Sequence, residues 1–283
     1  MKKFKRYIKR ILDIIRRPEM RVLPGQIAFF TVLSFVPIIT VVGLVAAQFS
    51  ISLNNLISAA SSLPNDIGNI VISVLSSPGT VSIYSIIIGF YIASNGACSI
   101  IITSNMLFKL KDSDYVKRRI KALLMLVILV LLFLFIILVL GYGNTIFNVI
   151  INYFNIELPA FTYYIFYVLK WFVAIIIIYI LIKLLLTFAP DESIPSKYMT
   201  RGAWFITISW AVVTSIYSIY ANNFANYNVF YSSLANVVVL MFWVYILSYL
   251  LVLGIAINSE KYLYLKELEQ KKEEIELEEE NKK

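Results

Sequence analysis

The chain has 283 residues, of which 60% are hydrophobic and only 15% are charged, and its formal net charge is +8. A soluble domain of this length needs far more polar surface, so the composition excludes an ordinary soluble protein and indicates one that spans a membrane several times. The chain has no histidine and one cysteine. This removes the commonest general base, the commonest transition-metal ligand and an internal disulfide, and we expect no cofactor or metal.

The first segment, residues 1–24, is strongly basic. Phe4, Ile8, Ile11 and Ile15 recur in it at helical spacing, with lysines and arginines between them. This pattern is typical of an amphipathic helix that lies in the membrane interface, where anionic head groups attract each basic residue by about 1 kcal/mol. We expect membrane lipids with anionic inner-leaflet head groups to be its partner. Nucleic acid is not expected, because no RNA-binding module accompanies the segment.

Residues 25–259 contain six apolar segments, and tracts of about 20 apolar residues match the roughly 30 Å hydrocarbon layer. Lysines and arginines gather before the first segment and in the second and fourth connections, whereas the first, third and fifth connections have none. By the positive-inside rule, both termini are expected in the cytoplasm. The sequence therefore predicts an all-α, six-helix bundle in the plasma membrane, with segments at 27–47, 81–107, 122–140, 163–188, 203–220 and 234–257.

The first apolar segment contains Pro37 in the run FFTVLSFVPIIT. Proline cannot donate to the carbonyl of Leu33, and the bilayer holds no water that could do so. We expect a kink near Pro37, with a neighbouring helix or hydroxyls such as those of Thr31 and Ser34 satisfying that carbonyl. A kink can open a substrate cavity or merely accommodate packing, and the sequence leaves both open.

The first connection, residues 48–80, is the longest and lies on the expected outer side. Ile67, Ile70, Val71 and Val74 recur in it at helical spacing. This predicts short outer interfacial helices, which either cap an external cavity or lie on the membrane surface.

The second apolar segment carries a polar stripe. Asn95, Ser99 and Thr103 recur every four residues and therefore share one helix face, beside a surface of small residues. Small residues let helix backbones approach, and polar side chains bond across such contacts. Interhelical packing and a pore lining both explain the stripe.

The fourth segment contains two lysines. Lys183 lies near the expected inner end, within snorkelling distance. Lys170 lies in the outer half, where an intramembrane charge indicates function by default. Its candidate carboxylate partners, Asp66 and Glu157, are both on outer loops. Lys170 either binds an anionic ligand or snorkels outward.

The last segment, residues 260–283, is a charged tail that reads KELEQKKEEIELEEENKK from Lys266. Its composition predicts a solvated helix that frays toward its end.

Three stretches together resemble the YihY/BrkB family of bacterial inner-membrane proteins, long labelled ribonuclease BN. They are GQIAFFTVLSFVPII, PDESIPSKYMTRGAW and YSSLANVVVLMFWVYILSYLLVLGIAIN, and the likeness covers about residues 20–260. The resemblance implies a six-helix plasma-membrane protein that takes part in moving lipids or other envelope molecules. The matching positions are Ala28, Ser34, Pro37, Pro190, Gly202, Ala203, Tyr231, Leu234, Trp243, Leu253, Gly254 and Asn258.

The chain departs from the family pattern at two places. Ala256 stands where the family's last span usually carries an acidic residue, and Ser232 stands where a glycine is usual. A carboxylate at the first place therefore cannot couple protons or ions in this chain.

The inherited ribonuclease label can be tested on the residues. RNA hydrolysis needs a general acid and base, or carboxylates that hold metal ions. The candidate cytoplasmic acids are Asp112, Asp114, Asp191 and Glu192. Charge balance explains the first pair, and helix capping and loop solvation explain the second, so we do not expect an enzyme.

The sequence favours transport of a lipid or another amphiphile, with Pro37, the Asn95–Thr103 stripe and Lys170 as candidate cavity residues. The alternative is a non-catalytic membrane scaffold or assembly partner that uses the basic N-terminus and the charged tail.

Overall fold

The computed structural model of the chain describes residues 13–48, 72, 83–136, 151, 160–224 and 232–280. Within these residues the chain is helical and has no strand, so the prediction of an all-α protein is confirmed. The elements are α2 (Glu19–Gln48), α5 (Ile83–Phe108), α6 (Tyr115–Ile136), α8 (Ala160–Phe188), the 3-10 helix η2 (Ser196–Tyr198), α9 (Thr200–Phe224) and α10 (Ser232–Glu280).

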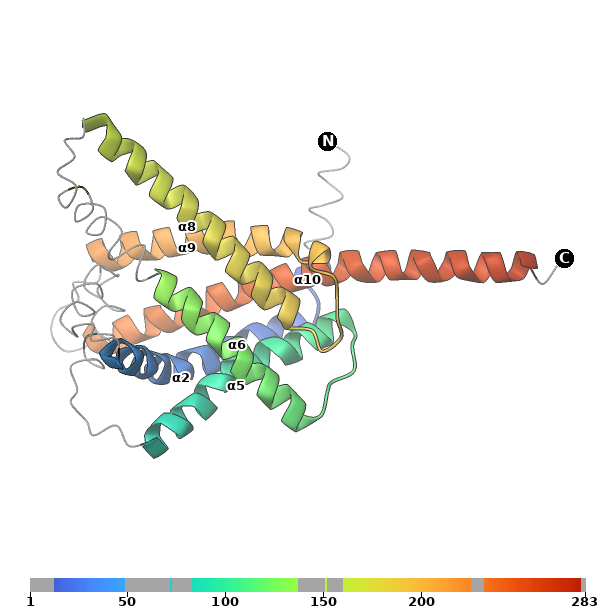
Figure 1. Cartoon of the computed structure of the whole chain (residues 1–283), viewed down its shortest axis with the longest axis horizontal. Helices are drawn as coiled ribbons and strands as arrows, with labels where there is room; N and C mark the ends of the chain where they lie inside the picture. The colour runs from blue at the N-terminus through green and yellow to red at the C-terminus, as the bar shows by residue number, and fades with distance from the viewer. Residues whose placement is uncertain are drawn as a thin grey trace.

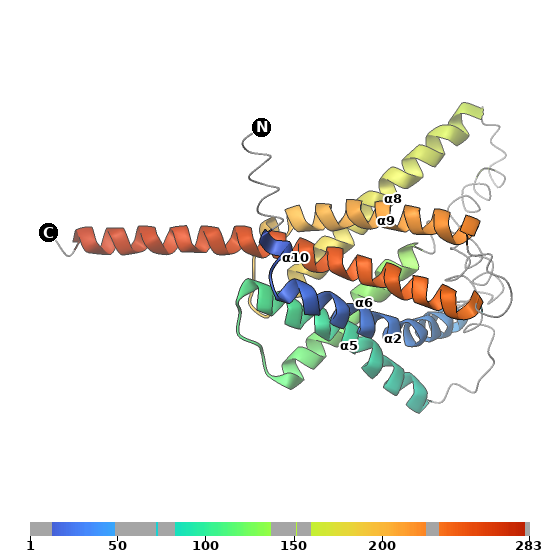
Figure 2. The same ribbon diagram turned by 180° about the vertical axis from the view of Figure 1, so that it is seen from behind.

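The helices pack as a bundle in which α2, α5, α9 and α10 make most of the contacts. In Figures 1 and 2 the first half of α8 leans away from the other described helices, while its second half approaches α6 and α9. Each predicted apolar segment overlaps one of the six long helices. Three stretches of the described residues are long and apolar enough to cross a membrane: Val168–Phe188, Thr200–Tyr220 and Val238–Lys272.

The α5–α6 connection and the α8–α9 connection lie together at one end of the bundle, on the right in Figure 1. The crossing of α9 with α10 lies at the same end. The ring of Tyr262 on α10 lies 5.8 Å from that of Phe108, at the end of α5, and 5.4 Å from that of Tyr198 in η2. We call this the loop end, defined by residues 105–114, 189–202 and 258–262. It unites the two basic connections that the sequence predicted to share one side.

Helix α10 is much longer than the bundle. Its 49 residues span about 70 Å, more than twice a hydrocarbon layer of about 30 Å. Figures 1 and 2 show it extending past the loop end as a single helix. The side chains of residues 266–272 are exposed there, and the charged tail is helical to Glu280 as predicted.

A buried hydroxyl lies in the contact between α2 and α5. Helix α2 runs through Pro37 without interruption. The Ser34 hydroxyl, only 2% exposed, shares its one hydrogen between two carbonyl acceptors, that of Phe30 on the same helix and that of Ala93 on α5, the second at 3.1 Å. The partners of this hydroxyl are therefore different from the Leu33 carbonyl that we had considered, and the kink stays a prediction.

Several predicted features lie outside the described residues. These are the amphipathic helix up to residue 12, the outer interfacial helices at 67–74 apart from residue 72, Asp66 and Glu157, and the motif residue Tyr231.

Candidate functional site

The loop end is held by a side chain that the sequence analysis did not single out. Asn105, in the last turn of α5, is fully buried. Its amide donates to Asp191 Oδ2 at 2.6 Å and to Asp112 Oδ1 at 2.9 Å, and its Oδ1 accepts the backbone N–H of Asp191 at 2.9 Å. Both amide hydrogens and the carbonyl oxygen are thus used, so Asn105 joins the α5–α6 and α8–α9 connections directly.

Asp191 is the centre of this network. Its side chain is only 6% exposed. Oδ2 also accepts the backbone N–H of Ser113 at 3.0 Å, and Oδ1 lies 3.0 Å from Lys121 Nζ on α6. The same ammonium donates to the carbonyl of Pro190, a motif residue. One carboxylate therefore ties together α5, α6 and both connections.

The pKa of the Asp191 carboxyl reflects a competition between burial and hydrogen bonding. Burial alone would raise the pKa, because it penalises the charged form. The hydrogen bonds from Ser113, Asn105 and Lys121 outweigh burial and lower the pKa from 3.8 to about 2. The carboxylate is therefore charged throughout the physiological range, where it stabilises the network.

The interpretation of Asp191 as a solvated loop residue is wrong. Glu192 is exposed, as expected, but the side chain of its neighbour turns into the protein. Asp112 is half exposed and lies 3.6 Å from Arg118, which agrees with charge balance. One signal could have revealed Asp191: it directly follows Pro190 and opens a stretch that matches the family.

A second junction joins the start of α9 to α10. The first N–H groups of a helix lack partners within that helix. Here Asn258, buried on α10, accepts the N–H of Gly202 at 2.7 Å and donates to the Met199 carbonyl at 3.2 Å. A motif asparagine of the last helix thus caps the preceding helix from outside it.

The two motif glycines let α9 and α10 come into backbone contact. A Cβ added to Gly202 would collide with the carbonyl oxygen of Gly254 and with the side chain of Asn258. A Cβ on Gly254 would collide with the side chain of Ile206. Both positions therefore require glycine at this crossing.

Other motif residues have packing roles. Trp243 on α10 stacks on Tyr217 of α9, with ring centroids 4.9 Å apart, and its indole N–H is buried without a hydrogen-bond partner among the described residues. Ala28 on α2 and Leu253 on α10 are buried.

The polar stripe of α5 faces the interior of the bundle. Ser99 and Thr103 are buried, and the Thr103 hydroxyl has no partner in the described part of the chain. Asn95 is half-buried and accepts a hydrogen bond from Arg119 Nη1 on α6 at 2.8 Å. The structure thus brings Asn95 to a cation and leaves Ser99 and Thr103 in a packed interior.

Lys170 lies in the first half of α8 and is half-buried. Positions four apart share a helix face. Lys170 therefore shares a face of α8 with Ala174, which is 3% exposed. The Lys170 ammonium also lies 6.0 Å from the centre of the Trp171 ring.

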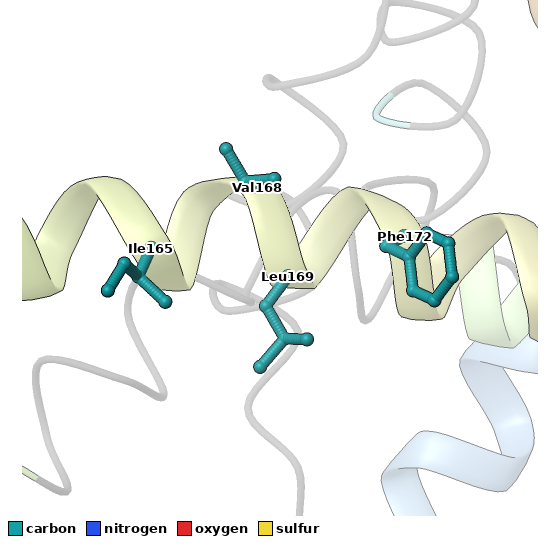
Figure 3. Close-up of a pocket in the computed structure, with 4 residues that line it drawn as sticks. All are labelled: Ile165, Val168, Leu169 and Phe172. Atoms are coloured by element: carbon teal, nitrogen blue, oxygen red, sulfur yellow. The ribbon is translucent and has the colours of Figure 1, made fainter.

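A shallow apolar hollow of about 320 Å³ lies on the other side of α8, roughly opposite Lys170. Figure 3 shows the four side chains that line it, all projecting from this one helix. Each is at least 47% exposed. They are Ile165, Val168, Leu169 and Phe172.

Acidic residues do not gather into a metal site in the part of the chain that the structure describes. No group of three His, Cys, Asp or Glu side chains there is arranged to hold an ion. Asp191 and Asp112 instead accept hydrogen bonds from the same amide.

The long apolar helices and their many exposed hydrophobic side chains define an integral membrane protein of the helical class. Residues 12–276 match the family described as virulence factor BrkB. The chain belongs to this family, which confirms the resemblance drawn from the sequence.

A curated relative is the ribonuclease-like protein YfkH of Bacillus subtilis (strain 168). It is 34% identical over 91 residues, which cover 32% of this chain. The match covers 33% of the relative, so the chain matches about one third of that protein's length. No solved structure matches the chain.

Proposed function

We propose that the protein crosses the plasma membrane six times, with both termini in the cytoplasm, and translocates a lipid or another amphiphile. The shared position of the two basic connections supports this topology, because the positive-inside rule puts both on the cytoplasmic face. The loop end is then the inner end, and α10 extends from it into the cytoplasm.

The two-sided character of α8 supports translocation. An amphiphile that crosses a bilayer needs a polar path for its head group, while its chains can stay in oil. The half-buried Lys170 shares a face of α8 with the buried Ala174, and the apolar hollow lies on the opposite side of the helix. The half-buried Lys170 within this apolar helix is the observation that carries the proposal, since intramembrane charges mark ligand and ion pathways.

Replacing Lys170 by methionine should abolish most lipid movement. Wild-type protein in vesicles should exchange a fluorescent phospholipid between leaflets faster than empty liposomes, and Lys170→Met should be slower by about tenfold, because the head group loses its charged contact. Lys183→Met, on the same helix but nearer the loop end, is the matched control and should exchange lipid at the wild-type rate.

Equal rates with wild-type protein and empty liposomes would contradict translocation. The scaffold function would then be the better proposal, and the charged helix that α10 projects past the loop end favours it as a docking element. Equal losses in the two lysine variants would remove Lys170 from the pathway.

The topology predicts opposite accessibility for two positions. In a Cys98→Ser background, a cysteine introduced by Asn65→Cys should react with a membrane-impermeant maleimide in intact cells. One introduced by Lys283→Cys should react only after permeabilisation, because the positive-inside rule places it in the cytoplasm. Labelling of both positions from the same side would overturn the six-span arrangement.

We do not propose the nuclease activity that the relative's name suggests. The low pKa of Asp191 makes its carboxylate a poor general base near neutral pH. Its oxygens are also taken by Asn105, Ser113 and Lys121.

A further inference from the structure

Three neighbouring basic residues of α6 have different surroundings. Arg118 lies 3.6 Å from the Asp112 carboxylate, and Lys121 lies 3.0 Å from that of Asp191. Arg119, between them, has no ion pair with any carboxylate of the described residues. An unpaired guanidinium in a membrane domain is costly in free energy, and an anionic partner would stabilise it.

Arg119 is nevertheless held in a fixed position. Its Nη1 donates to Ser94 Oγ at 2.9 Å and to Asn95 Oδ1 at 2.8 Å, both on α5. The guanidinium carbon lies 3.8 Å from the centre of the Tyr91 ring. Ser94 is itself buried, and its hydroxyl donates to the Tyr91 carbonyl at 2.8 Å. A buried polar base and an aromatic face thus orient the cation.

Two tyrosine hydroxyls complete the cluster at the surface. The hydroxyls of Tyr91 and Tyr115 lie 3.3 Å apart, and the two side chains are 51% and 59% exposed. The guanidinium Nε is itself buried and has no hydrogen-bond partner among the described residues, so the donors that face a ligand are the terminal guanidinium N–H groups and the tyrosine hydroxyls. The cluster therefore offers donors from a cation and from hydroxyls, the chemistry that binds a phosphate group.

The apolar neighbours of the cluster indicate whether the phosphate belongs to a lipid or is a free ion. Ile88 lies three residues before Tyr91 on α5 and is 58% exposed, and Leu123 lies four residues after Arg119 on α6 and is 39% exposed. Residues at these spacings share a helix face. Apolar surface therefore borders the cation, as acyl chains require and a free phosphate does not.

We propose that Arg119, Tyr91 and Tyr115 bind the phosphodiester head group of an anionic glycerophospholipid, with its chains against Ile88 and Leu123. The inference relies on the proposed membrane orientation, which places the start of α6 at the cytoplasmic leaflet. It does not require that lipid be moved across the membrane.

Native mass spectrometry of the full-length protein in detergent tests this site with added phosphatidylglycerol. Wild type should retain the lipid, and Arg119→Gln should bind it about tenfold more weakly, because a charge-assisted fork is lost. Lys117→Gln removes the same charge from an exposed position on the same helix and should bind like wild type. If Arg119→Gln does not fold, Arg119→Lys replaces it as the test variant. It keeps the charge but loses the planar fork of the guanidinium, so it should bind the lipid severalfold more weakly than wild type.

Three further results would overturn the proposal. Equal losses in Arg119→Gln and Lys117→Gln would indicate unspecific charge attraction. Retention of dioleoylglycerol as strong as that of phosphatidylglycerol would show that the phosphate is not recognised. Displacement of the lipid by millimolar inorganic phosphate would assign the site to free phosphate. Because binding is measured at equilibrium, failure here is distinguishable from failure of lipid exchange in vesicles.

Discussion

Replacing Gly202 by alanine should lower the apparent melting temperature of the purified protein by roughly 10 °C, which corresponds to a loss of about 3 kcal/mol. The added Cβ would collide with the carbonyl oxygen of Gly254, a backbone atom that cannot rotate away, and with the Asn258 side chain. Relief requires α9 and α10 to separate. Separation would also break the hydrogen bond between Asn258 and the N–H of Gly202.

Two other glycines provide graded controls for this prediction. Gly25 on α2 has open space where a Cβ would lie, so Gly25→Ala should leave the melting temperature unchanged or raise it slightly through helix propensity. A Cβ on Gly254 would collide with Ile206, whose fully buried, β-branched side chain can move aside only in part, so Gly254→Ala should also lower the melting temperature, but by less than Gly202→Ala. Equal melting temperatures for Gly202→Ala and Gly25→Ala would contradict the close backbone contact between α9 and α10.

The helices could be predicted from the sequence because their signal is local. Apolar runs of about 20 residues dominate the composition, and each predicted segment overlaps an observed helix. The helix ends were less predictable. Helix α6 begins at Tyr115 within the basic connection, seven residues before the predicted segment at 122, because charged residues extend a helix beyond its apolar part.

The loop-end network could not be predicted, because it depends on contacts between residues distant in sequence. Asn105 and Asp191 are 86 positions apart, and nothing local to either one indicates the other. An aspartate that lies between a proline and a glutamate is typical of an exposed surface loop. Only the packing of α5 against the α8–α9 connection buries it.

The family motif marked the right positions for the α9–α10 junction but did not give the reason. Gly202, Gly254 and Asn258 were singled out by resemblance alone. The structure supplies one cause for all three, a close helix crossing closed by a hydrogen-bonded cap. Asn95 illustrates the reverse case, because its helical spacing predicted a shared polar face but could not reveal Arg119 as its partner.

Replacing Asp191 by alanine should destabilise the protein by about 3 kcal/mol, since removing one partner leaves the other groups of a buried ionic network unsatisfied. The Lys121 ammonium, 21% exposed, would lose its counter-charge. The Ser113 N–H and one Asn105 amide hydrogen would lose their acceptor. Thermal unfolding in a nonionic detergent measures the effect. Glu192→Ala, the adjacent exposed carboxylate, is the control and should melt within about 1 °C of wild type.

The same network predicts a defined pH dependence. The folded-state pKa of Asp191, about 2, lies below its ordinary value of 3.8. The carboxylate therefore contributes about 2 kcal/mol of stability above roughly pH 4, and this contribution is lost as the pH falls toward 2. The melting temperature of wild type should exceed that of Asp191→Asn by a constant difference from pH 7 to about pH 5. This difference should shrink between about pH 4 and 2. Because the variant cannot titrate at this position, the comparison isolates Asp191 from the other carboxylates. A margin that persisted unchanged at pH 2 would mean that the charge of Asp191 does not hold the two connections together.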